Sequence, residues 1–157
     1  FRGEQLIASH GEFLGTHLLE QGAAEPSRIY FRSVGLMDPS GSWYHIAAVK
    51  YLAKNAYGPA DEFFQYALKH DAEKDKVLCN YAVLFETQGD WNRAESLYKD
   101  AITVKPGAVQ PHYNLAGLYW KQSRWRDVIH EFESVLKIEP SHPDARKYLE
   151  SARKKIL

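Results

Sequence analysis

Between residues 75 and 108 the apolar side chains fall at helical spacing in two successive stretches. The first stretch follows the i, i+3, i+4, i+7 spacing of one helix face, with Leu78, Tyr81, Ala82 and Phe85. The second stretch continues at helical spacing with Trp91, Ala94, Leu97, Tyr98 and Ala101. Gly89 separates the two stretches and Pro106 follows the second, and both residue types interrupt helices at such places. The pattern predicts two amphipathic helices joined by a tight turn.

This two-helix pattern returns every 34 residues. The recurring small positions are Ala48, Ala82 and Ala116, and Ala60, Ala94 and Val128. The recurring aromatic positions are Tyr51, Phe85 and Tyr119, then Tyr57, Trp91 and Trp125, then Phe64, Tyr98 and Phe132. A fixed period of this length indicates a stacked helical-repeat protein, because one helix pair alone cannot bury its apolar face. We therefore expect an all-α solenoid of antiparallel helix pairs.

The repeats divide a single predicted domain, residues 1–157, into five segments. We expect a degenerate repeat, three regular repeats and a C-terminal capping helix, about nine helices in all, over 8–40, 41–74, 75–108, 109–142 and 143–157. The first repeat lies 33 rather than 34 residues before its counterparts, which one deletion between Pro39 and Ala48 explains. The cap pairs an apolar stripe with a charged face, formed by Ala145, Leu149, Ala152 and Ile156 and by Arg146, Glu150 and Arg153. Such a helix suits the end of a repeat array.

The turn inside each repeat shows mild departures from the pattern. Gly22 and Gly89 occupy this turn in two of the repeats, whereas Asn55 and Ser123 replace glycine in the other two. Asparagine tolerates the left-handed backbone conformation that such turns often need. The departures leave the predicted fold unchanged.

At this register the chain resembles the tetratricopeptide repeat family, on Ala82, Phe85, Gly89, Ala94, Tyr98, Ala101 and Pro106 and their equivalents in the neighbouring repeats. The resemblance covers nearly the whole chain, and it is strongest in residues 75–142 and weakest before residue 40. It implies a right-handed superhelix with a concave groove. It also implies a scaffold without enzymatic activity, which binds a peptide or a helical segment of a partner protein in that groove.

By this resemblance, the first helix of each repeat lines the groove. The candidate partner-binding residues at inward-facing positions are His45, Lys76, Asn80, Gln110, Tyr113, Asn114, Trp120, Lys121, Lys147 and Tyr148. Asn80 and Asn114 share one phase of the repeat, and an amide both donates to and accepts from a peptide backbone. The two asparagines are either a short ladder for an extended chain or simply a residue type common in these repeats. Ile46 and Tyr148 interrupt the ladder on its two sides.

The aromatic residues of the groove also allow two interpretations. Tyr113 and Trp120 form either a platform for a partner side chain, as aromatic residues often do in interfaces, or part of the packed groove wall. Trp91 and Trp125 keep the phase of the repeat, so we expect both in the core between helices.

The charged residues exclude one binding mode of the family and leave another open. The carboxylate clamp of this family uses Lys, Asn, Asn, Lys and Arg at fixed phases. The two possible windows here read His45, Val49, Asn80, Gln110, Asn114 and Cys79, Val83, Asn114, Asp144, Tyr148. A carboxylate needs converging cations or N–H donors, so we exclude the clamp. The last helix is basic through Lys147, Arg153, Lys154 and Lys155, which suits either its own dipole or an acidic partner.

The amino-acid composition narrows the remaining classes of function. The chain has 20 Lys plus Arg and 20 Asp plus Glu, so we expect no nucleic-acid partner. Cys79 is the one cysteine, and no metal-binding or phosphate-binding motif is present, so we expect no metal, no cofactor and no enzyme. No stretch approaches the roughly 18 apolar residues of a membrane span, so we expect no direct membrane insertion. The compartment stays open between cytoplasm and periplasm.

Three functions remain to be weighed. The first is a scaffold for a protein or peptide partner. The second is a regulatory or substrate-docking appendage of a larger, membrane-bound or export-related enzyme or complex, because the sequence begins at Phe1 and so has the character of a fragment. The third is self-assembly into a homo-oligomer through the weaker N-terminal repeat.

Overall fold

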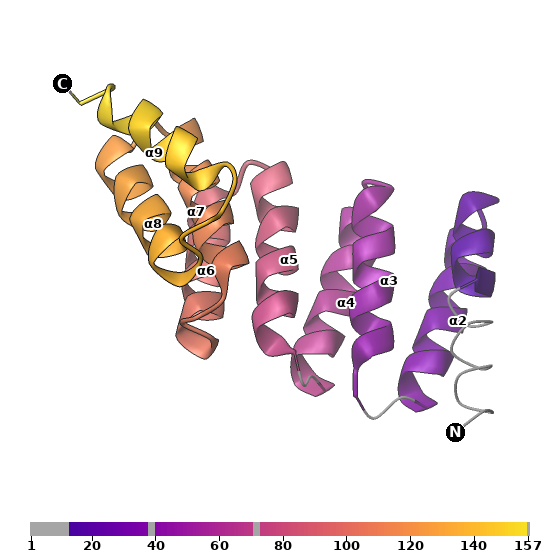
Figure 1. Ribbon diagram of the computed structural model, residues 1–157. Helices are drawn as coiled ribbons and strands as arrows, with labels where there is room; N and C mark the ends of the chain where they lie inside the picture. Colours follow the sequence, from indigo (N-terminus) through magenta and orange to yellow (C-terminus); the bar gives the residue numbers. More distant parts are fainter. Residues whose placement is uncertain (1–12, 38–39, 71–72, 157) are drawn as a thin grey trace. The chain divides into compact units, whose positions relative to one another are not determined.

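Helices make up all the regular secondary structure in the part of the chain that the computed structural model describes, residues 13–37, 40–70 and 73–156. Residues 13–20 are helical, and eight further helices follow (Figure 1): α2 Ala24–Met37, α3 Ser42–Ala53, α4 Tyr57–His70, α5 Lys74–Thr87, α6 Trp91–Val104, α7 Val109–Lys121, α8 Trp125–Ile138 and α9 Ala145–Arg153. The prediction of an all-α array of helix pairs is confirmed. None of the helices described here is long and apolar enough to cross a membrane.

The helices form two compact units, Phe1–Val77 and Leu78–Leu157. The first unit contains α2, α3 and α4, and the second contains most of α5 and all of α6 to α9. The prediction of a single domain with five segments stays a prediction.

An aromatic cluster forms the core of the first unit. The rings of Tyr51 and Phe63 stack with centroids 5.5 Å apart, and Phe31 meets each of them edge-on at 6.2 Å. All three side chains are fully buried. Edge-on and stacked ring pairs add to the free energy that burial of their area supplies.

The degenerate first repeat keeps small residues where its helices meet. Gly15 and Ser27 occupy the phases held by Ala48 and Ala60 in the next repeat. The buried Ser27 hydroxyl donates a hydrogen bond of 2.8 Å to the Gly15 carbonyl oxygen. A Cβ atom on Gly15 would lie 2.5 Å from the Phe31 ring, so this close approach requires glycine.

The turn inside each repeat has the same left-handed backbone in both units. The φ angles are +76° at Gly22 and +79° at Gly89, and they are +57° at both Asn55 and Ser123. Glycine adopts this conformation without steric cost, whereas other residues pay for it. The repeat therefore imposes the turn even where its residue is a serine.

The second unit has a core of aliphatic residues around one tyrosine. The fully buried side chains include Tyr98, Leu115, Leu118, Val128 and Val135. Helix α9 covers the end of this core with Ala145, Leu149 and Ala152, and Arg146, Glu150 and Arg153 are exposed. Ile156 does not continue the predicted apolar stripe, because α9 ends at Arg153 and Ile156 is 51% exposed.

The prediction that Trp91 lies in the core is wrong. Trp91 is the first residue of α6, and 41% of it is exposed. Its counterpart Trp125 is half-buried and packs edge-on against Trp120, with ring centroids 5.2 Å apart. One repeat earlier, the position of Trp120 holds Glu86, whose carboxylate binds other groups. Trp91 therefore lacks the ring that shields Trp125.

Candidate functional site

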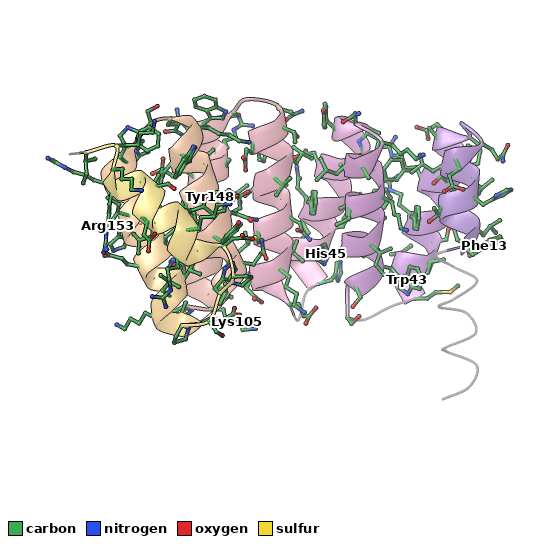
Figure 2. All side chains as sticks on the ribbon, turned by 45° about the horizontal axis from the view of Figure 1, so that its top comes forward. Phe13, Trp43, His45, Lys105, Tyr148 and Arg153 are labelled. Carbon is green, nitrogen blue, oxygen red and sulfur yellow. The ribbon has the colours of Figure 1, made fainter. Side chains whose placement is uncertain are left out.

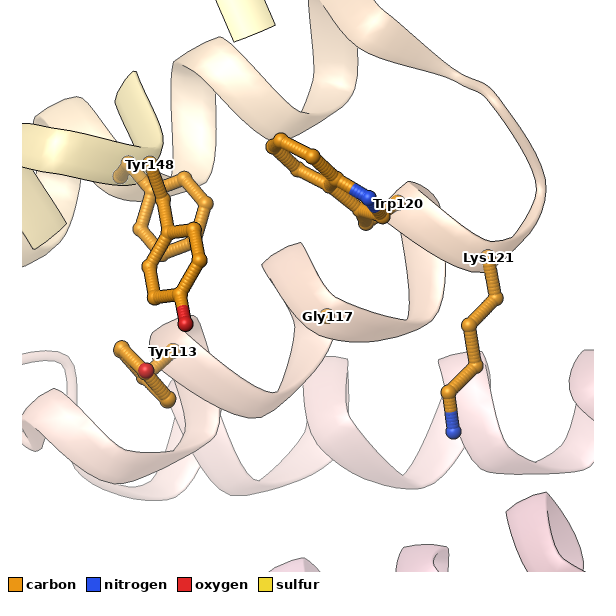
Figure 3. Close-up of a pocket in the computed structure, with 6 residues that line it drawn as sticks. Tyr113, Gly117, Trp120, Lys121 and Tyr148 are labelled. Atoms are coloured by element: carbon orange, nitrogen blue, oxygen red, sulfur yellow. The ribbon is translucent and has the colours of Figure 1, made fainter. Parts of the chain in front are cut away.

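A pocket of about 260 Å³ opens on the second unit, between α7, α8 and α9 (Figure 3). It is lined by Tyr113, Gly117, Trp120, Lys121, Phe132 and Tyr148. Tyr113, Trp120, Lys121 and Tyr148 are four of the ten candidate residues from the sequence, and the fold brings them together here.

Helix α7 contributes most of the pocket because its two faces have different roles. Tyr113, Gly117, Trp120 and Lys121 follow the i, i+4, i+7, i+8 spacing that places side chains on one face. The buried residues of the opposite side include Leu115, Ala116, Leu118 and Tyr119, which pack into the core. Packing of the core thus fixes the orientation of the pocket face.

Gly117 makes room for the pocket at the centre of this face. A Cβ atom built on Gly117 has no neighbour within 4 Å, so the space above the helix is open. The same phase of the repeat holds Val49 and Val83 in the two preceding repeats. The third regular repeat has lost a side chain that the others keep, and this loss leaves a hollow among the aromatic rings.

The aromatic walls brace one another. Phe132 and Tyr148 stack with ring centroids 5.7 Å apart, and Tyr113 meets Phe132 edge-on at the same distance. Trp120 meets Tyr148 edge-on at 5.9 Å. Behind the walls, Tyr113 stacks on His142 at 5.0 Å. Each ring is held by at least one other ring, so the pocket exists before anything binds.

Lys121 is the charged residue of the pocket lining. Lys121 Nζ lies 2.7 Å from Glu86 Oε1, and the Tyr98 hydroxyl donates to Glu86 Oε2 at 2.8 Å. Burial raises the pKa of Tyr98, and the Glu86 charge adds to this shift. Burial also raises the pKa of Tyr113, with further contributions from Tyr148 and Asp144. Both phenols therefore stay neutral near pH 7.

Asn114, one of the two residues of the predicted asparagine ladder, uses its amide for hydrogen bonds inside the second unit. The Asn114 amide nitrogen donates to the sulfur of the buried Cys79 at 3.3 Å, which links α7 to α5. Its amide oxygen accepts a hydrogen bond of 2.7 Å from Gln110. Asn80 is half-buried on α5. The Asn114 amide thus already has partners within the unit, and a role in binding a peptide backbone stays a prediction.

The remaining candidates lie outside the pocket lining. Lys147 is exposed on α9, one residue before Tyr148. His45 and Lys76 belong to the first unit, where the His45 ring lies 6.3 Å from the Phe64 ring and Lys76 pairs with Glu73. Figure 2 labels His45 on α3 and Tyr148 on α9.

Gly117 and Phe132 belong to the pocket but were not among the candidate residues. Phe132 keeps the aromatic phase of the repeat, so the sequence pattern assigns it to the core. The signal for Gly117 was its departure from the valines at the same phase. Among the residues that the structure describes, no group of three or more His, Cys, Asp and Glu side chains is placed to hold a metal ion.

Comparison with known proteins identifies the repeat. A family model described as tetratricopeptide repeat matches residues 86–152, which include the whole pocket. Tetratricopeptide repeat protein 17 of Danio rerio is 28% identical over 109 residues, which make up 69% of this chain and 9% of that protein. The matched region is thus a small part of that relative.

Solved structures show the same fold at low sequence identity. The PilF protein of Pseudomonas aeruginosa has a TM-score of 0.73 at 22% identity, covering 98% of this chain and 70% of that one. MamA has a TM-score of 0.72 at 14% identity, covering 94% and 81%. The first tetratricopeptide domain of Spaghetti (RPAP3), bound to the HSP90 peptide SRMEEVD, has a TM-score of 0.68 at 15% identity, covering 74% and 95%. These matches show tetratricopeptide repeats over residues 86–152 and the fold of tetratricopeptide-repeat proteins over most of the chain.

Proposed function

We propose that this chain is a protein-interaction scaffold that binds a peptide or a helical segment of a partner protein, with the pocket between α7, α8 and α9 as its anchor site. The observation that carries this proposal is the hollow over Gly117, walled by four aromatic side chains. Aromatic residues that enclose a pocket are typical of the few positions that supply most of the affinity of an interface.

The size of the pocket favours one protein side chain over a small-molecule ligand. Its volume of about 260 Å³ lies below the range of roughly 300–1,000 Å³ typical of small-molecule sites. A single large apolar side chain of a partner segment fits such a hollow and releases water from its aromatic walls.

The contacts among the side chains that line the pocket support the proposal on energetic grounds. Binding is weakened when side chains of the receptor must be ordered, at a cost of about 0.5–1.5 kcal/mol for each flexible side chain. Phe132, Tyr148 and Trp120 are already held by ring contacts, and Lys121 by Glu86. Most of the ordering cost therefore falls on the partner segment.

A solved structure with the same fold supports a peptide as the class of partner. One protein with this fold is bound to a peptide, SRMEEVD of HSP90, in its solved structure. We assign that class, a peptide of a partner protein, to this chain by proposal, and its identity is open. No catalytic role is included, and nothing in the described residues favours the docking appendage or the homo-oligomer over the scaffold.

The decisive experiment fills the pocket with the residue of the neighbouring repeats. Immobilised wild-type protein and its Gly117→Val variant are used to capture proteins from a lysate of the source organism. The control is Gly58→Val, because Gly58 lies in α4 of the first unit and an added Cβ there also meets nothing within 4 Å. Circular dichroism verifies that both variants are folded.

We expect a captured protein that wild type and Gly58→Val retain and Gly117→Val loses. A fragment of that protein should then bind purified wild type at least tenfold more tightly than Gly117→Val in calorimetry. Equal affinity for both would refute the pocket as the anchor site.

A further inference from the structure

Two lysines lie beside the pair of rings formed by Trp120 and Trp125. Lys121 is part of the pocket lining (Figure 3). The Lys155 ammonium lies 5.9 Å from the ring centroid of Trp125, which packs edge-on against Trp120. Both lysines thus neighbour Trp120, Lys121 directly in sequence and Lys155 through the Trp125 ring.

These two lysines retain donors for a partner. The Lys121 side chain is 58% exposed, and its contact with Glu86 occupies one of three N–H donors. Lys155 is exposed, and its described contact is with the face of Trp125. Arg124 is nearby in sequence but binds Glu95 and Asp127, so it serves the fold.

The two arginines of α9 are used differently. Arg153 pairs with Glu133, and Arg146 donates to the Pro140 carbonyl oxygen. These contacts tie the cap to the chain before it, which accounts for part of the basic character of α9. They leave Lys155, beside the tryptophan pair, as a cation whose position suits a partner.

We propose that the partner segment carries one large apolar anchor residue for the pocket, with acidic residues on the side that faces Trp120, where Lys121 and Lys155 receive their carboxylates. This inference rests on the proposed function. Burial of the anchor supplies most of the affinity, and the exposed charges select the partner and its direction, as charges at the rim of an interface commonly do.

The test uses two capped peptides of equal length, each with one central phenylalanine. One peptide has three glutamates on one side of the phenylalanine, and the other has three lysines there. Each is titrated into 15N-labelled protein, and the indole N–H signal of Trp120, a lining residue that every variant keeps, reports occupation of the pocket. The variants are Lys121→Gln/Lys155→Gln and a matched control, Lys137→Gln, which changes an exposed lysine of α8.

We expect the acidic peptide to bind wild type about fivefold more tightly than the basic one at low salt, since two exposed charge contacts add little each. Salt at about 1 M should remove most of that preference. The double variant should lose the preference, and Lys137→Gln should keep it. Filling the pocket with Gly117→Val should abolish binding of both peptides.

Two other outcomes separate this inference from the proposed function. If both peptides bind wild type equally and Gly117→Val loses both, the pocket is an anchor site and the charge preference is wrong. If neither peptide shifts the Trp120 indole signal of wild type at millimolar concentration, the result overturns the pocket as a peptide site, and this inference with it.

Discussion

The His112 Nδ1 atom lies 2.6 Å from the Glu131 Oε2 atom, and this contact joins α7 to α8 inside the second unit. The two side chains are only 11% and 10% exposed. At the same phases, the preceding repeat has Leu78 and Leu97. One repeat has therefore placed a polar pair where another has an apolar pair.

This pair gives a prediction about stability. Glu131→Leu removes the partner of the buried His112 Nδ1, and His112→Leu leaves Glu131 with the contact to His130 at 3.1 Å. Each change should lower the free energy of unfolding by about 1–3 kcal/mol. The double change to Leu and Leu restores the residues of the preceding repeat. It should be neutral or should raise the free energy of unfolding by about 1–4 kcal/mol. Urea unfolding at pH 7 measures all four proteins.

The double variant is the sharper half of this test. If its loss equals the sum of the two single losses, the site does not accept an apolar pair and the comparison between the repeats is misleading. A value near wild type would show that the pair is not needed for stability.

Glu95 gives a prediction about pH. Its carboxylate accepts hydrogen bonds from Lys99 and Arg124 at 2.7 Å and from the Tyr119 hydroxyl at 3.0 Å. Burial opposes its ionisation, but these bonds outweigh burial and lower the pKa of Glu95 below 4.5. Burial and the bond to Glu95 raise the pKa of Tyr119 to about 12, so Tyr119 remains a donor.

A carboxylate with a lowered pKa in the folded state contributes stability above its unfolded pKa, and it loses that contribution as pH falls through the folded value. Glu95→Gln should therefore lower the free energy of unfolding by about 1–3 kcal/mol at pH 7. The difference from wild type should shrink once pH falls below 4.5, the ordinary value for this group. Urea unfolding between pH 7 and pH 3 checks this, with the exposed Glu139→Gln as control. A difference independent of pH would contradict it.

Ser123 gives a prediction about backbone strain. It adopts the left-handed conformation with φ +57° and is exposed, whereas Gly89 fills the same turn one repeat earlier. The conformation costs a non-glycine residue about 1–2 kcal/mol, part of which glycine loses again through the freedom of the unfolded chain. Ser123→Gly should raise the free energy of unfolding by about 0.5–1 kcal/mol.

Thermal unfolding followed by circular dichroism measures this gain. The matched change is Asn55→Gly, which should gain less because asparagine tolerates the same conformation better than serine does. A loss of stability in Ser123→Gly would mean that the serine side chain stabilises the turn in a way that its backbone angles do not reveal.

The features shared by all repeats were predictable from the sequence, and the exceptions were not. The period located the helices, the left-handed turns and the small residues at helix contacts, because each follows from packing that every repeat must achieve. The pocket depends instead on Gly117, where one repeat differs from Val49 and Val83. The repeat pattern is defined by the residues that recur, so a residue that differs in one repeat is not part of it.

The error at Trp91 has the same physical origin. Its phase matches Trp125, but burial of a ring depends on what faces it, and that position holds Trp120 in one repeat and Glu86 in the other. Tyr113, Trp120, Lys121 and Tyr148 were found as candidates because the helix face could be inferred. Their convergence on one hollow required the packing of α8 and α9.

Gly117 itself gives the last prediction, which separates stability from binding. A glycine inside a helix costs about 0.5–1 kcal/mol relative to alanine, and an added Cβ at Gly117 meets no atom within 4 Å. Gly117→Ala should therefore raise the free energy of unfolding by about that amount while it weakens binding of the partner segment by narrowing the pocket. Gly58→Ala, equally open but in α4, should gain no more stability than Gly117→Ala and leave binding unchanged. Urea unfolding and calorimetry with the partner fragment measure the two effects. If Gly117→Ala is more stable and binds the partner fragment as tightly as wild type, binding does not depend on the glycine. If Gly117→Ala loses both stability and affinity, the space above Gly117 is not open.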